Sequence, residues 1–348
     1  MKRFIAACLC ALVGFTFCSC SNLNKIKHKY ISQEIESVNY NNVSAGTCNV
    51  WLDNNGVYYC SHDFFFNVYS ITSKGRSRIR SLSYGCDLIS LDGKLYMYES
   101  KVGTKFNFIE YDLIKETSTI IATINAEIIE YYYVTDDYLY VVSRTSESLQ
   151  KNLVIYSLNT KETIKTVENI FSCGIVGDEL LYVMNCANKY EIHKYNSLSD
   201  TSTSIGSFEY KLNEYEELES SDVNYTSNKI VFRYYKYDGK TETSKLVIYQ
   251  LDDGAIIEFE PTNYISNIIA YDRYAFIVTI KNNNPNNADY TSTLYRLNLD
   301  TLEFYEISTF NDHIDLFVTS DEDVYVMSNE IYDLTYYDIN GTNTKIIQ

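Results

Sequence analysis

The side chains able to do chemistry are spread along the chain and form no catalytic or metal-ligating motif. No Cys-x-x-Cys pair occurs, and no histidine has a second one at ligand spacing. The pairs nearest to an acid–base arrangement are His62-Asp63 and His313-x-Asp315, but single histidines in loops are far commoner than catalytic ones. We therefore predict no metal and no cofactor, and we assign no catalytic residue.

Carboxylates leave one enzymatic alternative open. The 46 acidic residues are numerous enough to hide a few dispersed channel carboxylates of a carbohydrate-active enzyme. Acidic turns such as Asp136-Asp137 lack the alternating oxygen ligands and the late glutamate of a calcium loop. No phosphate-binding glycine loop or nucleophile elbow is present. An enzyme is the less favoured interpretation.

Two pairs of cysteines bracket predicted hairpin turns. Cys48 and Cys60 are equidistant from Asn54, so they could face each other across antiparallel strands, and we take this pair as a candidate disulfide. Cys173 and Cys186 bracket a corresponding turn, but they are one or two residues out of register, which makes this second bridge the weaker candidate.

The first twenty residues have the composition of an export signal. Lys2 and Arg3 precede an apolar stretch, residues 4–17, which is shorter than the roughly 20 residues that a membrane-spanning helix needs. The segment Phe17-Cys18-Ser19-Cys20 comes next, and polar residues stand directly after it. One interpretation of these residues is an ordinary secretory signal that is cut near this segment.

The segment around Cys20 resembles a bacterial lipobox, in which a small residue precedes the cysteine that becomes lipidated and N-terminal. Ser19 fits the small position, whereas Phe17 stands where leucine is usual. The resemblance implies lipidation at Cys20, after removal of residues 1–19 as a lipoprotein signal peptide. Two acyl chains on one cysteine give stable anchoring. We therefore favour an extracytoplasmic protein anchored to a bacterial membrane through its lipid over an ordinary secreted one.

The net charge narrows the choice of partners. The formal charge is −17, and an acidic chain repels polyanions, so we expect no nucleic acid as a partner. A protein or a carbohydrate remains as the partner class.

An internal repeat organises the rest of the chain. A polar turn followed by an apolar run ending in an aromatic residue occurs seven times, and a second signature close to Tyr-x-Leu/Ile follows each copy. The closing aromatics of the first series are Tyr58, Tyr96, Tyr140, Tyr182, Phe232, Phe276 and Tyr325. A period of about 40–50 residues is typical of β-propellers built from four-stranded blades.

The repeat predicts an all-β fold, a single β-propeller of about seven four-stranded blades, with six or eight as alternatives. Residues 44–348 would form the propeller. Residues 20–43 would be the tether, and part of it, residues 27–43, would either supply a ring-closing strand or serve only as a tether. We interpret residues 209–220 as a linker with a short helix, and twelve of the 35 tyrosines as packing residues of the two signatures.

The repeats resemble those of the YVTN and TolB-like propellers of bacterial envelope proteins, and the nearest copy runs from Tyr133 to Tyr140. This resemblance implies a rigid interaction platform outside the membrane. Unequal loops on such a scaffold are where binding usually resides, and the longest expected loop covers residues 281–292. A tolerated insertion is the alternative for that loop.

Overall fold

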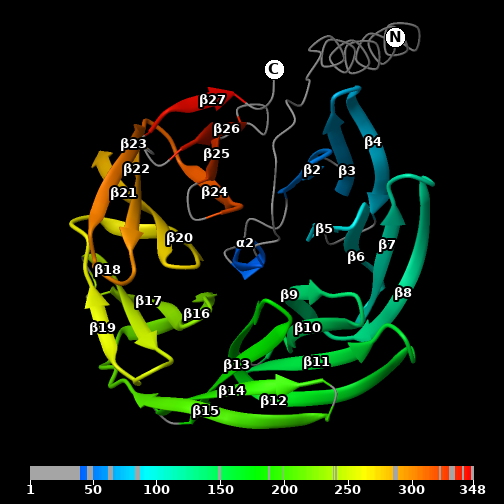
Figure 1. Cartoon of the computed structure of the whole chain (residues 1–348), viewed down its shortest axis with the longest axis horizontal. Helices are drawn as coiled ribbons and strands as arrows, with labels where there is room; N and C mark the ends of the chain where they lie inside the picture. The colour runs from blue at the N-terminus through cyan, green and yellow to red at the C-terminus, as the bar shows by residue number, and fades with distance from the viewer. Residues whose placement is uncertain are drawn as a thin grey trace, which may run out of the picture.

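The computed structural model is a ring of antiparallel sheets around a central axis (Figure 1). It describes residues 40–44, 50–61, 66–82, 87–147, 150–186, 189–197, 199–237, 239, 241–284, 289–320, 323–328, 334–338 and 341–345. In these residues, no helix is long and apolar enough to cross a membrane.

Two four-stranded sheets come first along the chain. The first contains β1 (Val50–Asp53), β2 (Gly56–Ser61), β3 (Phe66–Thr72) and β4 (Gly75–Leu82). The second contains β5 (Ile89–Leu91), β6 (Lys94–Val102), β7 (Lys105–Asp112) and β8 (Thr117–Asn125). In each sheet the strands pair in chain order.

The third and fourth blades share one long strand. The sheet contains β9 (Ile128–Val134), β10 (Tyr138–Arg144), β11 (Lys151–Ser157), β12 (Glu162–Val176), β13 (Glu179–Cys186), β14 (Lys189–Asn196) and β15 (Thr201–Glu209). The first part of β12 pairs with β11, and its last part, from Ile170 onward, pairs with β13. Strand β12 is thus the outer strand of the third blade and the inner strand of the fourth.

Three further four-stranded sheets complete the ring. The fifth blade contains β16 (Glu216–Tyr225), β17 (Lys229–Tyr237), β18 (Glu242–Gln250) and β19 (Ile256–Phe259). The sixth contains β20 (Tyr264–Tyr271), β21 (Tyr274–Asn284), β22 (Asp289–Asn298) and β23 (Phe304–Phe310). The seventh contains β24 (Ile314–Val318), β25 (Val324–Ser328), β26 (Leu334–Tyr337) and β27 (Asn343–Lys345). With β12 shared by two blades, the ring has seven, as the repeat predicted.

The repeated residues occupy equivalent places in the blades. Every closing aromatic of the first signature lies on the second strand of its blade and is buried. The tyrosines of the second signature lie on the third strands. Asp92 and Gly93, with φ of 50° and 73°, form the two-residue turn between β5 and β6, as the Asp-Gly pair favours. The predicted alternation of turn and strand is confirmed.

Two local expectations are wrong. Strand β16 begins at Glu216 and pairs with β17, so residues 216–220 are strand and not helix. The expected loop 281–292 is largely paired as well, because Lys281 lies opposite Thr291 and Asn284 opposite Asp289. The hairpin between β21 and β22 therefore extends outward as a ladder, and polar, asparagine-rich residues form its edges.

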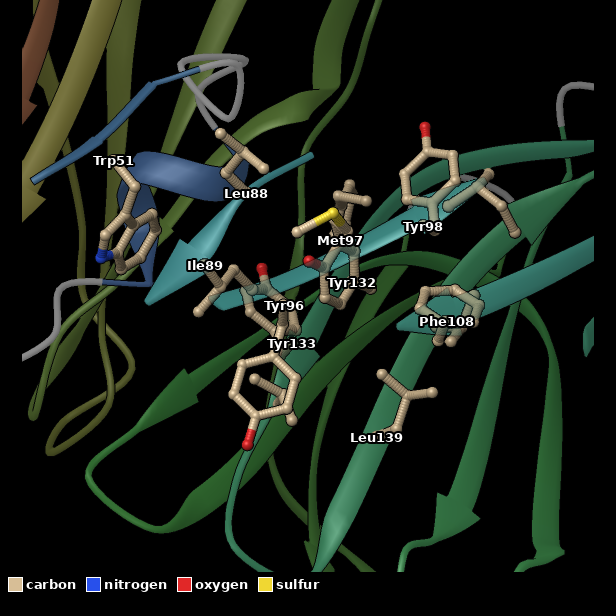
Figure 2. Packing of buried hydrophobic residues seen from close by; sticks show 14 of the residues in the cluster. Trp51, Leu88, Ile89, Tyr96, Met97, Tyr98, Phe108, Tyr132, Tyr133 and Leu139 are labelled. Atoms are coloured by element: carbon tan, nitrogen blue, oxygen red, sulfur yellow. The ribbon is translucent and has the colours of Figure 1, made fainter. Parts of the chain in front are cut away.

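The core lies between neighbouring blades and is rich in aromatic rings (Figure 2). Tyr132 of β9 meets Phe108 of β7 with ring centroids 5.2 Å apart, and it meets Tyr98 of β6 at 6.0 Å. Its hydroxyl donates to the carbonyl of Asp87 in the second blade, at 3.0 Å. The hydroxyl of Tyr133 donates to the carbonyl of Cys173 in the fourth blade, at 2.9 Å. These consecutive tyrosines therefore join the third blade to both neighbours.

A short helix occupies the axis of the ring (Figure 1). We call Tyr40 together with α2 (Asn41–Ser44) the axial segment. The Asn41 side chain donates to the carbonyls of Tyr225 and Ala270, at 3.0 and 2.7 Å, and accepts from the amide of Tyr225. The Asn42 side chain both donates to and accepts from the backbone of Val318, at 2.8 and 2.9 Å.

The axial segment lies at one end of the ring. The groups that it contacts come from the last residues of the inner strands β16, β20 and β24, and the Tyr40 hydroxyl reaches the carbonyl of Val134, the last residue of β9. Two amide side chains and one tyrosine hydroxyl thus hydrogen-bond backbone groups at the inner edges of four blades. This end of the ring is held together by one short stretch of chain.

Candidate functional site

Three acidic and three basic side chains meet near the end of the ring where the inner strands begin. We call this group the charged cluster, and it consists of Glu130, Arg144, Lys151, Glu219, Asp222 and Arg233. The acids come from the inner strands β9 and β16, and the bases come from β10, β11 and β17. Glu130 and Glu219 lie in the first half of their inner strands, whereas the axial segment contacts the last residues of these strands, and Asp222 lies between, three residues before Tyr225.

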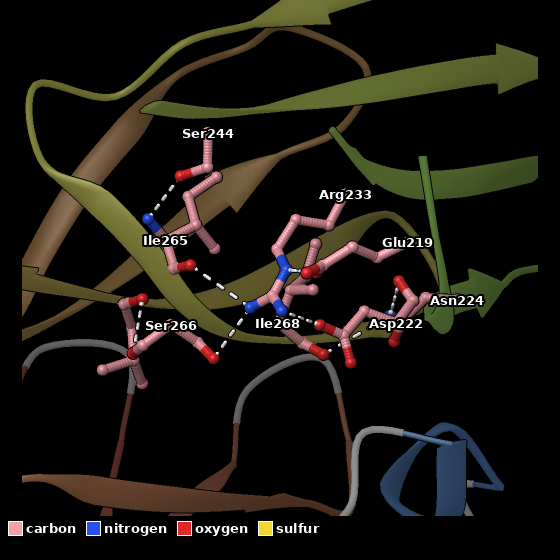
Figure 3. A network of polar contacts seen from close by, with 9 residues as sticks. Glu219, Asp222, Asn224, Arg233, Ser244, Ile265, Ser266 and Ile268 are labelled. Carbon is pink, nitrogen blue, oxygen red and sulfur yellow. Dashed lines mark hydrogen bonds and ion pairs between the residues drawn. The ribbon is translucent and has the colours of Figure 1, made fainter. Parts of the chain in front are cut away.

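Arg233 is the centre of the half in the fifth blade (Figure 3). Its Nε atom pairs with Glu219 and its Nη2 atom lies 2.6 Å from Asp222 Oδ2. Its Nη1 atom donates to the carbonyls of Ile265 and Ser266 in the sixth blade, at 3.2 and 2.9 Å. One guanidinium thus binds two carboxylates and the neighbouring inner strand, a use of its planar set of donors that a lysine could not reproduce.

Glu130 and Lys151 form the half in the third blade. Glu130 Oε1 lies 2.5 Å from Arg144 Nε, and its other oxygen lies 3.6 Å from Lys151 Nζ. Lys151 also donates to the carbonyl of Ser220 on β16, at 3.3 Å. This lysine of the third blade therefore reaches across to the fifth blade. The two halves are therefore in contact.

Burial changes the acidity of two members. It raises the pKa of the Asp222 carboxyl to about 6; the Arg233 charge opposes this shift, and the nearby Glu219 adds to it. Burial also lowers the pKa of the Lys151 ammonium, against the attraction of Glu130. The cluster is partly accessible to solvent. The relative exposure of the side chain is 11% for Arg233, 18% for Glu219 and 15% for Asp222.

The arrangement offers several chemical capabilities. It presents carboxylate acceptors, a fixed guanidinium and an acid whose pKa lies closer to neutrality than usual. Such groups can hydrogen-bond a polar ligand, and a carboxyl of raised pKa can also serve as a proton donor. In the described part of the chain, no group of His, Cys, Asp and Glu has the geometry to hold a metal ion.

The other predicted site residues lie apart from this cluster. Cys20 and Cys48 lie outside the described residues, so lipidation and the Cys48–Cys60 disulfide stay predictions. Cys60 lies buried on β2. Cys173 and Cys186 are free thiols, which rules out the second bridge. The reason is register, because Cys173 lies opposite Tyr182 and Cys186 opposite Lys189.

The described histidines do not gather into a site. His193 stacks on Tyr182 with ring centroids 5.0 Å apart, and its Nε2 atom lies 3.7 Å from Glu191. His313 Nε2 and Asp315 Oδ1 are 3.9 Å apart, with both side chains about half exposed. His28 and His62 lie outside the described residues.

The sequence alone does not single out the members of the charged cluster. Glu219, Asp222 and Arg233 belong to one hairpin, β16–β17, whereas Glu130 precedes them by almost ninety residues. Nothing in the local sequence distinguishes these acids from the other carboxylates of the chain. Placement of an acid within a predicted inner strand is no signal for Glu219, because the sequence predicts residues 209–220 as a linker with a short helix.

Comparisons with known proteins inform the fold. No family model and no curated protein matches the sequence. The β-propeller domain of the Trilobed protease from Pyrococcus furiosus is similar in structure, with a TM-score of 0.56 and 14% identity over 85% of this chain and 95% of that one. The tricorn protease gives a TM-score of 0.56 and 12% identity over 91% of this chain and 35% of that one. Hsv2 from Kluyveromyces lactis gives 0.53 and 11% over 84% and 96%.

The chain has the β-propeller fold. At such low identities the likeness extends to the fold alone, and it carries neither a proteolytic activity nor a ligand to this chain. The Trilobed protease propeller is described as having an open velcro topology. In this chain, each blade of the described structure takes its four strands from one continuous stretch, with β12 shared by two blades. Residues 40–43 lie in the axial segment and not in a closing strand, and residues 27–39 lie outside the described residues.

Among the residues that the structure describes, the first and seventh blades meet through side chains. The indole of Trp51 on β1 contacts the ring of Phe317 on β24, with centroids 5.3 Å apart and an interplanar angle of 79°. Tyr325, Met327 and Leu334 of the seventh blade belong to the same hydrophobic core as the first blade. The junction between first and last blades is therefore a packed interface like the others.

Proposed function

We propose that this protein is a lipid-anchored, extracytoplasmic β-propeller that binds a protein or a glycan at the end of the ring bearing the charged cluster. The observation that carries the proposal is the difference between the two ends. At one end the axial segment satisfies backbone groups of the inner strands. At the other, charged side chains from five strands of the third and fifth blades converge, and several of them are partly exposed.

The proposed anchor rests on the sequence around Cys20. The axial segment indicates where a tether from this cysteine would join the ring. A tether that ends at Tyr40 would attach to the ring at its axis, at the end away from the charged cluster. The fully extended length of 20 residues is about 70 Å, which would leave the propeller clear of the membrane surface. The charged cluster would then be accessible to partners in the extracytoplasmic space.

Lipidation can be tested with a matched pair of cysteine variants. The full-length chain would be expressed in a bacterium and labelled metabolically with an alkyne fatty acid. We expect Cys20→Ala to lose the label and to leave the membrane fraction, whereas Cys18→Ala should keep both. Label retained by Cys20→Ala and lost by Cys18→Ala would move the anchor by two residues, and an unlabelled wild-type chain would refute the anchor.

Binding can be tested on arrays of oligosaccharides and peptides, probed with residues 21–348. We expect binding to one array class, and we expect its loss in a Glu219→Gln, Asp222→Asn double variant. The control is Asp137→Asn, which removes an exposed carboxylate at the turn after β9, at the end where the axial segment lies. Equal loss in the control, or no binding to either array, would contradict the proposal.

A carbohydrate-active enzyme is the second candidate, and one observation favours it. Three acids lie in the cluster, and the pKa of Asp222, raised to about 6, suits a general acid better than an ordinary aspartate would. Prolonged incubation with oligosaccharides, followed by chromatography of the products, tests it. Hydrolysis abolished by Asp222→Asn supports the enzyme, and intact oligosaccharides with wild-type protein contradict it.

A further inference from the structure

Beside the charged cluster, one face of β17 carries Arg233, Tyr235 and Tyr237. Alternate residues of a strand point to the same side of its sheet, so the three side chains form a row. Exposure increases along this row, since Arg233 is buried, Tyr235 is half-buried and Tyr237 is 44% exposed. The row therefore leads from solvent to the guanidinium at the centre of the cluster.

A tyrosine from the next blade faces this row. Tyr264, the first residue of β20, meets Tyr235 with ring centroids 6.2 Å apart and an interplanar angle of 85°. Burial raises the pKa of the Tyr264 hydroxyl, with Arg233 opposing and Glu219 adding to the shift. Arg233 also donates to the carbonyl of Ile265, the residue after Tyr264, so both tyrosines lie beside the Arg233–Glu219 pair.

The Tyr235 hydroxyl makes a hydrogen bond within its own blade. It donates to Glu242 Oε1 on β18, at 3.3 Å, which restrains the ring along the strand. A half-buried ring with a restrained hydroxyl loses little side-chain entropy when it binds a ligand, because tyrosine has only two side-chain torsions. The site therefore combines restrained tyrosine rings with the polar groups of the Arg233–Glu219 pair beside them.

The charge balance of the site limits the ligand. Glu130, Glu219 and Asp222 balance Arg144, Lys151 and Arg233 when all six are ionised, and Glu242 at the Tyr235 hydroxyl adds a negative charge that disfavours an anionic ligand. A charged ligand would have to compete with one of these ion pairs and leave a buried charge without its partner, which is costly. A neutral ligand rich in hydroxyls can accept and donate hydrogen bonds while the pairs stay intact.

We propose that Tyr235, Tyr264 and the Arg233–Glu219 pair form a subsite for a neutral pyranose unit of a glycan. The tyrosine rings contact the apolar C–H face of the sugar, and the guanidinium and carboxylate bind its hydroxyls. This inference rests on the proposed function, since it specifies the ligand class at the same end of the ring. It goes beyond that function by naming the chemistry of the ligand and the residues that select it.

The inference can be tested by saturation-transfer NMR and calorimetry on residues 21–348. The probes are neutral oligosaccharides of glucose, galactose, mannose and N-acetylglucosamine, compared with oligomers of glucuronic acid of similar length. We expect at least one neutral probe to bind, and the uronic acid oligomers to bind at least tenfold more weakly. No neutral probe bound at millimolar concentration would overturn the inference.

Variants assign the binding to this site. We expect Tyr235→Ala and Tyr264→Ala each to weaken binding at least tenfold, and Tyr235→Phe to retain most of it, because the ring face is kept. The control is Tyr305→Ala, which removes a tyrosine that is 50% exposed on the outer strand β23. Circular dichroism checks that each variant is folded. Unchanged affinity in both Tyr235→Ala and Tyr264→Ala would contradict the assignment.

The outcome also separates the two proposals. Peptide binding that depends on Glu219 and Asp222, without binding of any neutral sugar, would overturn the pyranose subsite and retain the proposed function. Absence of both would refute the two together.

Discussion

At the scale of single residues, two buried features have consequences that can be measured. One is the close approach of Gly174 to a ring of the next blade. The other is the ionisation of Asp222 in the charged cluster.

Gly174 leaves room for Tyr225. A Cβ atom at position 174 would lie 2.3 Å from Cδ2 of Tyr225, whose ring is buried and whose hydroxyl lies 2.6 Å from that of Ser172. The ring cannot move without breaking this hydrogen bond or leaving the core. We expect Gly174→Ala to lower the free energy of unfolding by about 1–3 kcal/mol, measured by urea denaturation.

Gly206 provides the matched control. A Cβ atom there would approach the terminal hydroxyl of Tyr249, at 2.6 Å, and the end of a side chain can shift more readily than the middle of a clamped ring. Gly206→Ala should therefore cost clearly less than Gly174→Ala. Equal effects of the two substitutions would show that the contact with Tyr225 is not the cause.

Asp222 should make stability depend on pH. Its folded pKa of about 6 lies above the ordinary value, so its favourable contribution is fully present below about pH 4 and is lost as the pH rises through 6. Asp222→Asn lacks this titration. We expect the wild type to lose about 2–3 kcal/mol relative to Asp222→Asn between pH 4 and pH 7, in denaturation curves of both proteins. A constant difference across this range would contradict the raised pKa.

At the scale of elements, the axial segment does what a closing strand does in other rings. Asn41 alone makes three hydrogen bonds to the backbone of the fifth and sixth blades. Asn224 makes a comparable bridge between the same two blades, with bonds to the backbone of Ile268 and Ala270. Amide side chains can hold strand edges together because they carry a donor and an acceptor, as the backbone does.

Removal of the Asn41 amide should therefore weaken the whole ring. We expect Asn41→Ala to lower the free energy of unfolding by about 2–4 kcal/mol, since it removes three buried hydrogen bonds to the backbone of Tyr225 and Ala270. Asn159→Ala is the control, because Asn159 is exposed and bonds only the side chain of Asp137 among the contacts described. A loss as small as that of the control would mean that the inner strands do not depend on the axial segment.

At the scale of the whole molecule, the junction of the first and seventh blades is the place where the chain does not continue. Every other pair of neighbouring blades is joined by a covalent connection as well as by packing. Trp51, the single tryptophan, lies in this junction and is 2% exposed, so its fluorescence reports on closure of the ring.

We expect Phe317→Ala to open this junction before the blades unfold. The substitution should cost about 3–5 kcal/mol, and the tryptophan transition should occur at a lower urea concentration than the transition in circular dichroism. In Phe232→Ala, which removes a buried ring between the fourth and fifth blades, the two transitions should coincide. Coincident transitions in Phe317→Ala would show that the ring unfolds as one unit, although no covalent connection joins the first and seventh blades.

The sequence by itself indicated a propeller of about seven blades and most of the strands within them. Residues such as Tyr96 and Tyr182 recur at equivalent places because each blade buries the same face of its second strand, and a local pattern of turn and aromatic is enough to reveal it. It did not reveal that residues 216–220 extend β16, since these residues are paired by β17 and not by their own propensity.

Only the tertiary structure decided which side chains meet. Glu130 and Glu219 lie on inner strands of different blades, and the ring brings them to one place through Lys151. The axial segment is a second example, because Asn41 finds its partners at Tyr225 and Ala270, about two hundred residues away. The physical reason is that a repeat encodes contacts within a blade, whereas the site and the closure depend on contacts between blades, which closing the ring brings about.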